Sequence, residues 1–395
     1  MRASTPIRWS QLITLLVVAA FCSFALIGRA QDWDQLALER IYSPPLGLPE
    51  VSIPPDNRPT RAKIALGRKL FFDRRLSSNN TMSCAMCHVP EQGFTNNELS
   101  TAIGVEGRTV RRNSPTIFNV AYAKSMFHDG RDNALETQIF GPLLARAEMA
   151  NPSIGWLLAK IRRLDNYKEL FENAFGTGPD VRTLGWALAS YERSVLSGNS
   201  PFDHWLFGGD NKALSTQAIE GYKLFIGKAG CAACHPIEDN YALFTDHGLH
   251  NTGIGVARDE KESDDLSPVK VELAPGVFVE MERKAVDAVG HAPIKDFGRL
   301  EVTNNADDLY KYKTPTLRNV TLTAPYMHDG SLRTLEEVVR FYNKGSYPNP
   351  SLDPAIRPLG LTDAEINALV AFLESLTGDN VETLIADARS VPIGN

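Results

Sequence analysis

Two stretches of the sequence repeat one arrangement of cysteine and histidine. Residues 84–88 are CAMCH and residues 231–235 are CAACH, so each fits the pattern C-x-x-C-H. Two thiols at this spacing can each add to a vinyl group of a porphyrin, and the adjoining histidine can then bind the iron. The sequence therefore predicts two covalent haem c groups, one held by Cys84, Cys87 and His88 and the other by Cys231, Cys234 and His235.

Zinc is the alternative for an isolated C-x-x-C-H motif, because half of a zinc site has a similar spacing. The chain has five cysteines, and the fifth, Cys22, lies near the N-terminus. The sequence contains no further Cys/His pairs at the spacing that would complete a zinc site. All four later cysteines are assigned to haem, so no disulfide framework is expected.

The composition is that of a globular protein, with 395 residues, 43% of them hydrophobic and 22% charged. This is enough apolar material for two domains of ordinary size. The formal net charge of −6 argues against nucleic acid or an anionic membrane surface as a partner. A small basic electron donor is compatible with it.

Residues 1–30 have the pattern of an export signal peptide. Arg2 and Arg8 precede an apolar run from Leu12 to Ile27, and Ala30 is a small residue suited to cleavage before Gln31. A retained membrane anchor is the alternative, since the run approaches the roughly 20 residues that span a bilayer. We expect a periplasmic mature protein without membrane contact after cleavage.

A second repeat lies downstream of each C-x-x-C-H motif. Residues 114–120 are SPTIFNV, followed by FHDG at 127–130 and LE at 135–136. In the other half, TPTLRNV at 314–320 is followed at the same offsets by MHDG and LE. Equal spacing of several blocks indicates an internal duplication, with the domain boundary near residues 198–213.

Helical patterns connect these blocks. Residues 154–175 and 181–196 carry apolar residues every three or four positions, and T-x-x-E capping boxes at 334–337 and 362–365 open further helices. The predicted fold is mainly α, with two cytochrome c-like haem domains related by internal duplication and with long loops. Its parts are an extended N-terminal arm (31–57), an N-terminal haem domain (58–200), a C-terminal haem domain (201–378), which includes a charged surface loop at 256–300, and a tail (379–395).

Two haems in one chain allow electron transfer, and catalysis depends on whether one iron keeps an open face. The motifs together resemble the bacterial di-haem cytochrome c peroxidase family, which includes MauG. The resemblance covers residues from about 65 to 378. It implies a peroxidatic N-terminal haem, a C-terminal haem for electron transfer, and a calcium ion between the domains.

The resemblance also assigns residues to the first haem. Family members have a glutamate base in an E-M pair after a Q-x-x-x-P segment, and this sequence has Gln138, Pro142 and Glu148 at those places. It implies that Glu148 is the proton-shuttling base, with Gln138 and Pro142 lining the distal pocket. A surface carboxylate is the alternative for Glu148.

Two departures from the family pattern concern the first haem and its surroundings. No histidine lies between Val89 and Arg112, where reductively activated members carry one that caps the iron. We therefore expect a first haem that is open as isolated. The family's F-W-D-G-R block has His128 in place of tryptophan, so His128 is either a poor electron relay or a hydrogen-bonding partner of a haem propionate or a backbone carbonyl.

At the second haem, alignment of the blocks puts Tyr342 at the place of the sixth iron ligand in MauG-like members. Met327 is the competing ligand, and Tyr342 as a core aromatic is the third alternative. His247 and His250 follow the second motif and are expected to be structural. The calcium ligands implied by the resemblance are the side-chain oxygen of Asn113 and the backbone carbonyls of Thr323 and Pro325.

The expected function is that of a di-haem peroxidase, which reduces hydrogen peroxide with electrons from a small cytochrome c or a cupredoxin. A MauG-like oxidase of a protein or organic substrate is the first alternative. A plain electron carrier with both irons saturated is the second. The resemblance is also compatible with a homodimer.

Overall fold

The computed structural model describes residues 31–264, 268–274, 276–282 and 295–392. Contacts divide the chain into Met1–Trp33 and Asp34–Asn395, and both C-x-x-C-H motifs lie in the second unit. The predicted signal peptide, residues 1–30, lies outside the described residues. Within the described ranges, no helix is long and apolar enough to cross a bilayer.

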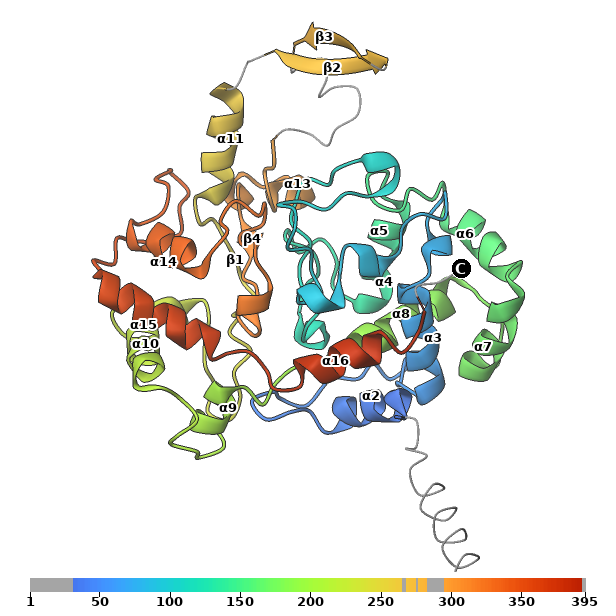
Figure 1. Cartoon of the computed structure of the whole chain (residues 1–395), viewed down its shortest axis with the longest axis horizontal. Helices are drawn as coiled ribbons and strands as arrows, with labels where there is room; N and C mark the ends of the chain where they lie inside the picture. Colours follow the sequence, from blue (N-terminus) through green and yellow to red (C-terminus); the bar gives the residue numbers. More distant parts are fainter. Residues whose placement is uncertain (1–30, 265–267, 275, 283–294, 393–395) are drawn as a thin grey trace, which may run out of the picture. The chain divides into compact units, whose positions relative to one another are not determined.

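The described chain is mainly helical, as the sequence predicts (Figure 1). Its α-helices are α2 (Trp33–Tyr42), α3 (Arg61–Phe71), α4 (Leu135–Gln138), α5 (Phe140–Leu144), α6 (Ile154–Arg162), α7 (Asp165–Phe175), α8 (Val181–Arg193), α9 (Pro201–Leu206), α10 (Thr216–Ile226), α11 (Ile254–Asp264), α13 (Leu300–Thr303), α14 (Leu335–Asn343), α15 (Asp363–Glu374) and α16 (Val381–Ala388). The strands form two antiparallel pairs, β1 (Leu249–His250) with β4 (Tyr312–Lys313) and β2 (Val269–Ala274) with β3 (Val277–Met281).

Both capping boxes are present. The Thr334 hydroxyl accepts from the Glu337 amide at the start of α14, and Thr362 and Glu365 do the same at the start of α15. The helix expected over residues 154–175 is interrupted at Arg163 and Leu164, which gives α6 and α7.

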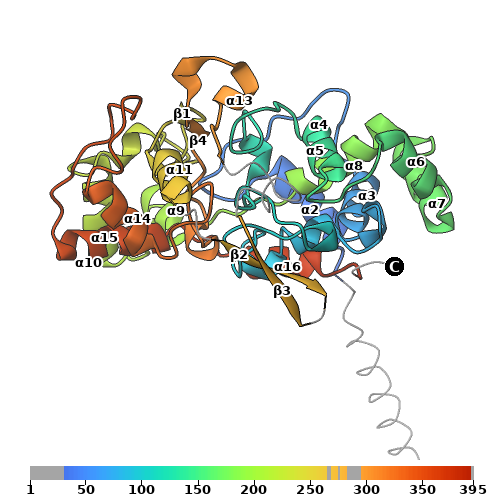
Figure 2. The same ribbon diagram turned by 90° about the horizontal axis from the view of Figure 1, so that it is seen from above.

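Two helix crossings organise the two cores. α3 packs against α8 and α10 packs against α15, and the views in Figures 1 and 2 agree on both pairs. A Cβ at Gly67 would lie 2.0 Å from the carbonyl oxygen of Ala187, and one at Gly221 would lie 1.9 Å from that of Ala368. Each crossing is therefore close enough to require glycine. The α3–α8 core is rich in buried phenylalanine and leucine, and so is the α10–α15 core.

The blocks that repeat in the sequence follow similar backbone courses. Asn119 and Asn319 both have a left-handed φ, of 59° and 58°. Each block then closes through an isolated antiparallel bridge, between residues 126 and 132 in one half and between residues 326 and 332 in the other. Repeated sequence spacing thus corresponds to repeated local structure.

The ends of the described chain differ from the expectation of an extended arm and a tail. Residues 31–57 begin with α2, which buries Ala37 and Ile41. Residues 379–392 contain α16, which buries Leu384 and Ala388 in the α3–α8 core. Arg40 of α2 forms an ion pair with Asp387 of α16, so both ends belong to the packed structure.

The charged segment at 256–300 also differs from the expected surface loop. It contains most of α11 and the whole β2–β3 hairpin, and then the start of α13. Residues 265–267, 275 and 283–294 of this segment lie outside the described residues.

Candidate haem sites and the wall between them

The first C-x-x-C-H motif begins with a short 3-10 helix, Cys84–Met86, which is followed by Cys87 and His88. A carbonyl oxygen can only accept, so the contact of 3.2 Å between His88 Nδ1 and the Phe94 carbonyl places a proton on Nδ1. Burial lowers the pKa of His88, which keeps the ring neutral. Its Nε2 is then available as an iron ligand.

The second motif repeats this geometry. Cys231–Ala233 form a 3-10 helix, and His235 Nδ1 donates to the Phe244 carbonyl over 2.7 Å. Burial also lowers the pKa of His235. In both motifs, therefore, a backbone carbonyl orients the ring through Nδ1.

The four motif cysteines are unbridged. Burial raises the pKa of Cys87 to about 12 and that of Cys231 and Cys234 to about 11. A zinc site needs thiolates, which this environment disfavours. Thioether attachment leaves the sulfur uncharged and suits it, so the chemistry of the sulfur atoms fits haem c.

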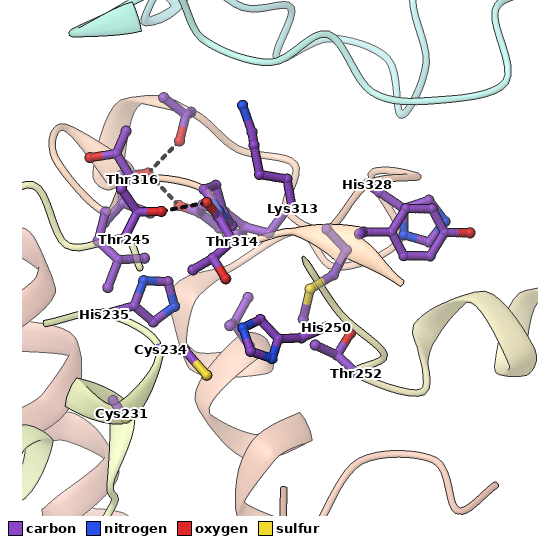
Figure 3. A pocket seen from close by; sticks show the side chains of 18 of the residues that line it. Cys231, Cys234, His235, Thr245, His250, Thr252, Lys313, Thr314, Thr316 and His328 are labelled. Atoms are coloured by element: carbon purple, nitrogen blue, oxygen red, sulfur yellow. Dashed lines mark hydrogen bonds between the residues drawn. The ribbon is translucent and has the colours of Figure 1, made fainter. Parts of the chain in front are cut away.

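Each motif opens on its own cavity. The first cavity, of about 500 Å³, is lined by Cys84, Cys87, His88, Gln138, Pro142 and Glu148. The second, of about 370 Å³, is lined by Cys231, Cys234, His235, Met327 and Tyr342, and Figure 3 shows a pocket lined by its motif residues. Both volumes lie in the range of roughly 300–1,000 Å³ that is typical of cofactor sites. The structure thus gathers the predicted residues around the two motifs.

Glu148 lies in the loop after α5. Its amide donates to the Ala145 carbonyl over 3.0 Å, and its carbonyl accepts from the Val105 amide over 2.9 Å, so the backbone is held on both sides. Burial raises the pKa of its carboxyl group, and the charge of Arg131 opposes that rise. Glu148 is thus a largely desolvated acid in the first cavity, with properties that suit a proton shuttle.

Glu192, near the end of α8, is a second acid in the first cavity, and the sequence analysis missed it. The residue is 7% exposed, and burial raises the pKa of its carboxyl group to about 8. The neighbouring Arg193 pairs with Glu136 over 2.8 Å and opposes the rise only in part. The spacing of Glu192 in the sequence could have indicated its burial. Glu192 lies four residues after Leu188, on the same buried face of the helix.

Tyr342 on α14 and Met327 both line the second cavity, so both remain candidates for the sixth ligand. Burial raises the pKa of the Tyr342 phenol, and the nearby Cys231 and Cys234 add to the rise. His250 also lines this cavity, but its two ring nitrogens contact Asp353 at 2.6 Å and Asp246 at 2.8 Å. Both nitrogens are therefore engaged, as expected for a structural residue.

A shared wall separates the two cavities. The residues that line both are Asn113, Ser114, Pro115, Thr116, Val120, Phe127, His128 and Lys313. Burial lowers the pKa of His128 to about 4, so its ring is neutral, and Nε2 contacts the Asn113 carbonyl over 2.9 Å. One of the interactions proposed for His128, a hydrogen bond to a backbone carbonyl, is thus present. Its part in electron transfer stays a prediction.

The three predicted calcium ligands border one cavity. Asn113, Thr323 and Pro325 all line the second cavity. The side-chain nitrogen of Asn113 donates to the Ser100 carbonyl over 2.9 Å. Among the described residues, no hydrogen bond uses Asn113 Oδ1 or the carbonyl oxygens of Thr323 and Pro325. Three hard oxygen atoms are therefore available, which fits the chemistry of calcium.

Comparison with known proteins agrees with this geometry. A family model described as di-haem cytochrome c peroxidase matches residues 61–212. The cytochrome-c peroxidase IdrP1 of Denitromonas iodatirespirans is 38% identical over 383 residues, 95% of this chain and 95% of that protein. The chain belongs to the di-haem cytochrome c peroxidase family. The MauG protein of Methylorubrum extorquens is 34% identical over 388 residues, covering 96% of this chain and 97% of that protein.

Among solved structures, a MauG-like protein associated with microbial copper homeostasis superposes with a TM-score of 0.67 at 29% identity, covering 85% of this chain and 95% of that one. Membership of the di-haem cytochrome c peroxidase family makes the chain a peroxidase-type oxidoreductase. It implies haem c as cofactor, peroxide as oxidant, and a redox partner or protein substrate.

Proposed function

We propose that the chain is a periplasmic di-haem peroxidase that reduces hydrogen peroxide at the first haem with electrons that enter at the second. One observation carries the proposal. Two acids and an amide, Glu148, Glu192 and Gln138, border the first cavity, whereas Tyr342 and Met327, both able to bind iron, border the second. The first site suits proton transfer and the second suits a closed electron-transfer centre.

When bound, the haem groups supply the redox chemistry, and the chain supplies proton transfer and positioning. Reduction of one peroxide to two waters consumes two electrons and two protons. In our proposal Glu148, ionised, accepts the proton of the proximal peroxide oxygen and returns it to the leaving oxygen. The amide of Gln138 positions the peroxide by hydrogen bonding, and Pro142 closes the pocket without offering a competing donor.

We propose that the first site needs no reductive activation, because no histidine occurs between Val89 and Arg112. A MauG-like oxidase of a protein or organic substrate is the second candidate. Tyr342 in the second cavity favours it, and His128 in place of an oxidisable tryptophan weakens it.

The remaining features of the proposal rest on the sequence, on the structure and, for the donor and the homodimer, on the family resemblance alone. The repeated blocks and the two glycine crossings support two haem domains related by duplication, residues 58–200 and 201–378. The oxygens of Asn113, Thr323 and Pro325 that make no hydrogen bond among the described residues support a calcium ion that joins the two haem domains. Residues 1–30 support export. A small cytochrome c or a cupredoxin is the proposed donor, and a homodimer is the proposed assembly.

One experiment tests the proposal. One equivalent of hydrogen peroxide is added to the fully oxidised full-length holoprotein, and the Soret spectrum is followed by stopped flow. A prompt change without prior reduction, followed by peroxide-dependent oxidation of a reduced small cytochrome c, is the expected result. Reaction after partial reduction alone would contradict the open first site. If the protein neither reacts with peroxide nor binds cyanide, the proposal is wrong and the chain is an electron carrier with both irons saturated.

A further inference from the structure

The wall between the cavities contains a charged side chain to which the sequence analysis assigned no role. Lys313, at the end of β4, lines both cavities. Figure 3 shows its side chain extending away from Cys234 and His250, towards a neighbouring segment of the chain. There its Nζ donates to the carbonyl oxygen of Ser125 over 2.8 Å. Lys313 thus links the second half of the chain to the first.

The charge of Lys313 lacks a carboxylate partner in the described part of the chain. Among the residues that the structure describes, no carboxylate lies within 4 Å of its Nζ, although a more distant Asp129 stabilises the ammonium. Burial lowers the pKa of Lys313 to about 8, because holding this charge away from water is unfavourable. A buried cation is usually paired.

The other cations that line the first cavity are already paired. Arg112 contacts Asp129 at 2.5 Å and Asp296 at 2.6 Å. Arg111 pairs with Glu301 at 2.5 Å, and Arg131 contacts Asp129 at 3.0 Å. Lys313 differs from all three, since it reaches both cavities and meets only a carbonyl dipole.

The repeated blocks relate Lys313 to the predicted calcium site. Position 313 precedes one P-T block as position 113 precedes the other, so Lys313 corresponds to Asn113. By the same offset of 200, Ser125 corresponds to Pro325, whose carbonyl is a predicted calcium ligand. Asn113 of the first half and the Pro325 carbonyl of the second are predicted to bind a cation. At the corresponding positions, the ammonium group of Lys313 in the second half, itself a cation, lies against the Ser125 carbonyl of the first.

We propose that the Lys313 ammonium forms an ion pair with a haem propionate, and so acts as a cation in the wall between the two haem sites. Haem is the ligand implied for both cavities, and its two propionates are the carboxylates that it would bring to this wall. The inference rests on the proposed two-haem function. It adds a residue that binds the cofactor and raises its reduction potential, because a nearby positive charge stabilises the reduced state.

The test uses the full-length holoprotein and spectroelectrochemical titration of both haems. Lys313→Gln keeps a donor for Ser125 but removes the charge, Lys313→Arg keeps the charge, and Lys311→Gln is the matched control. Lys311 lies two residues away, with a side chain that is 32% exposed and 3.4 Å from Asp308. We expect Lys313→Gln to lower the ratio of reduced to oxidised haem about tenfold at fixed potential for at least one haem, about 59 mV. Lys313→Arg and Lys311→Gln should stay close to wild type.

Unchanged potentials in Lys313→Gln, with haem content and circular dichroism intact, would overturn the proposal. If Lys313→Gln fails to incorporate haem, the Lys313→Arg variant distinguishes an ion pair from a packing role. Full haem content with near-wild-type potentials in that variant supports an ion pair, whereas loss of haem there too indicates a packing role and contradicts it. A wild-type protein without any haem would instead refute the proposed function itself.

Discussion

The backbone N–H of Lys313 donates to the carbonyl oxygen of His128 over 2.7 Å. The corresponding bond in the other half runs from the Asn113 N–H to the His328 carbonyl, also over 2.7 Å. Each bond joins the residue before one P-T block to the H-D-G block of the other half. The two blocks therefore build the wall between the cavities jointly, and its geometry depends on both halves of the chain.

Glu148→Gln should slow the reaction with peroxide by about 10²- to 10⁴-fold, because an amide cannot accept the proton. In the wild-type protein the Glu148 carboxylate becomes protonated, and can no longer act as a base, as the pH falls through its pKa, which burial has raised. The acid limb of the rate profile should thus lie above the ordinary glutamate value of about 4.3, and it should vanish in the variant. Stopped-flow rates across pH test this. Glu106→Gln, at an exposed acid, is the control, and an equal loss of rate there would contradict a specific role for Glu148.

Tyr342→Phe should alter the spectrum of one haem and leave the other unchanged, since the phenol is the predicted ligand of the second iron. Electron paramagnetic resonance of the oxidised protein separates the two haems. Tyr326→Phe is the matched control, because Tyr326 lines the same cavity and its hydroxyl donates to the Val320 carbonyl. If Met327→Leu changes the spectrum and Tyr342→Phe does not, methionine is the ligand.

The repeat of motif blocks made the two cavities predictable, because the blocks keep the same spacing in both halves even where single residues differ. Helices α2 and α16 were not predicted. Each buries only a few apolar side chains, and the ion pair that links them joins Arg40 and Asp387, which are 347 residues apart. No local pattern carries that information.

Lys313 and Glu192 were missed for a related reason. A single charge in a sequence is usually solvated, and the spacing of Glu192 from Leu188 is a weak signal against that expectation. Lys313 lies on β4, which pairs with β1, and Glu192 lies on α8, which crosses α3 at Gly67. Both placements involve contacts between segments that are far apart in the sequence.

Arg318 and Asp203 should be essential for stability. Arg318 is 1% exposed, and its guanidinium donates to both carboxylate oxygens of Asp203 at 2.8 Å. Arg318→Ala leaves the buried Asp203 carboxylate without its cationic partner, although Ser200 still donates to it, and should cost about 3–5 kcal/mol in the free energy of unfolding. Denaturant unfolding of the holoprotein measures it. Arg340→Ala, which removes an exposed pair, should cost about 0–1 kcal/mol, and comparable losses in both variants would contradict the argument.

Removal of calcium tests the predicted ion between the two halves. The purified holoprotein should contain one calcium per chain by elemental analysis, and a chelator should lower the midpoint of thermal unfolding, because a ligand of the native state stabilises it. Asn113→Ala should lose the ion and respond little to chelator. Asn133→Ala, at an exposed asparagine, should retain it. A wild-type chain without calcium would refute the site.

Glu192 should make stability depend on pH. Its pKa is about 8 when folded, against about 4.3 for an unfolded glutamate, so between these values the folded state holds a proton that the unfolded state has released. Stability should therefore fall as pH rises across that window, by up to about 1.4 kcal/mol per pH unit. Glu192→Gln should remove this slope, whereas Glu169→Gln, at an exposed acid on α7, should keep it. Denaturant unfolding of the holoprotein between pH 5 and 8 measures the slopes, and parallel curves for wild type and Glu192→Gln would show that this carboxyl group titrates normally.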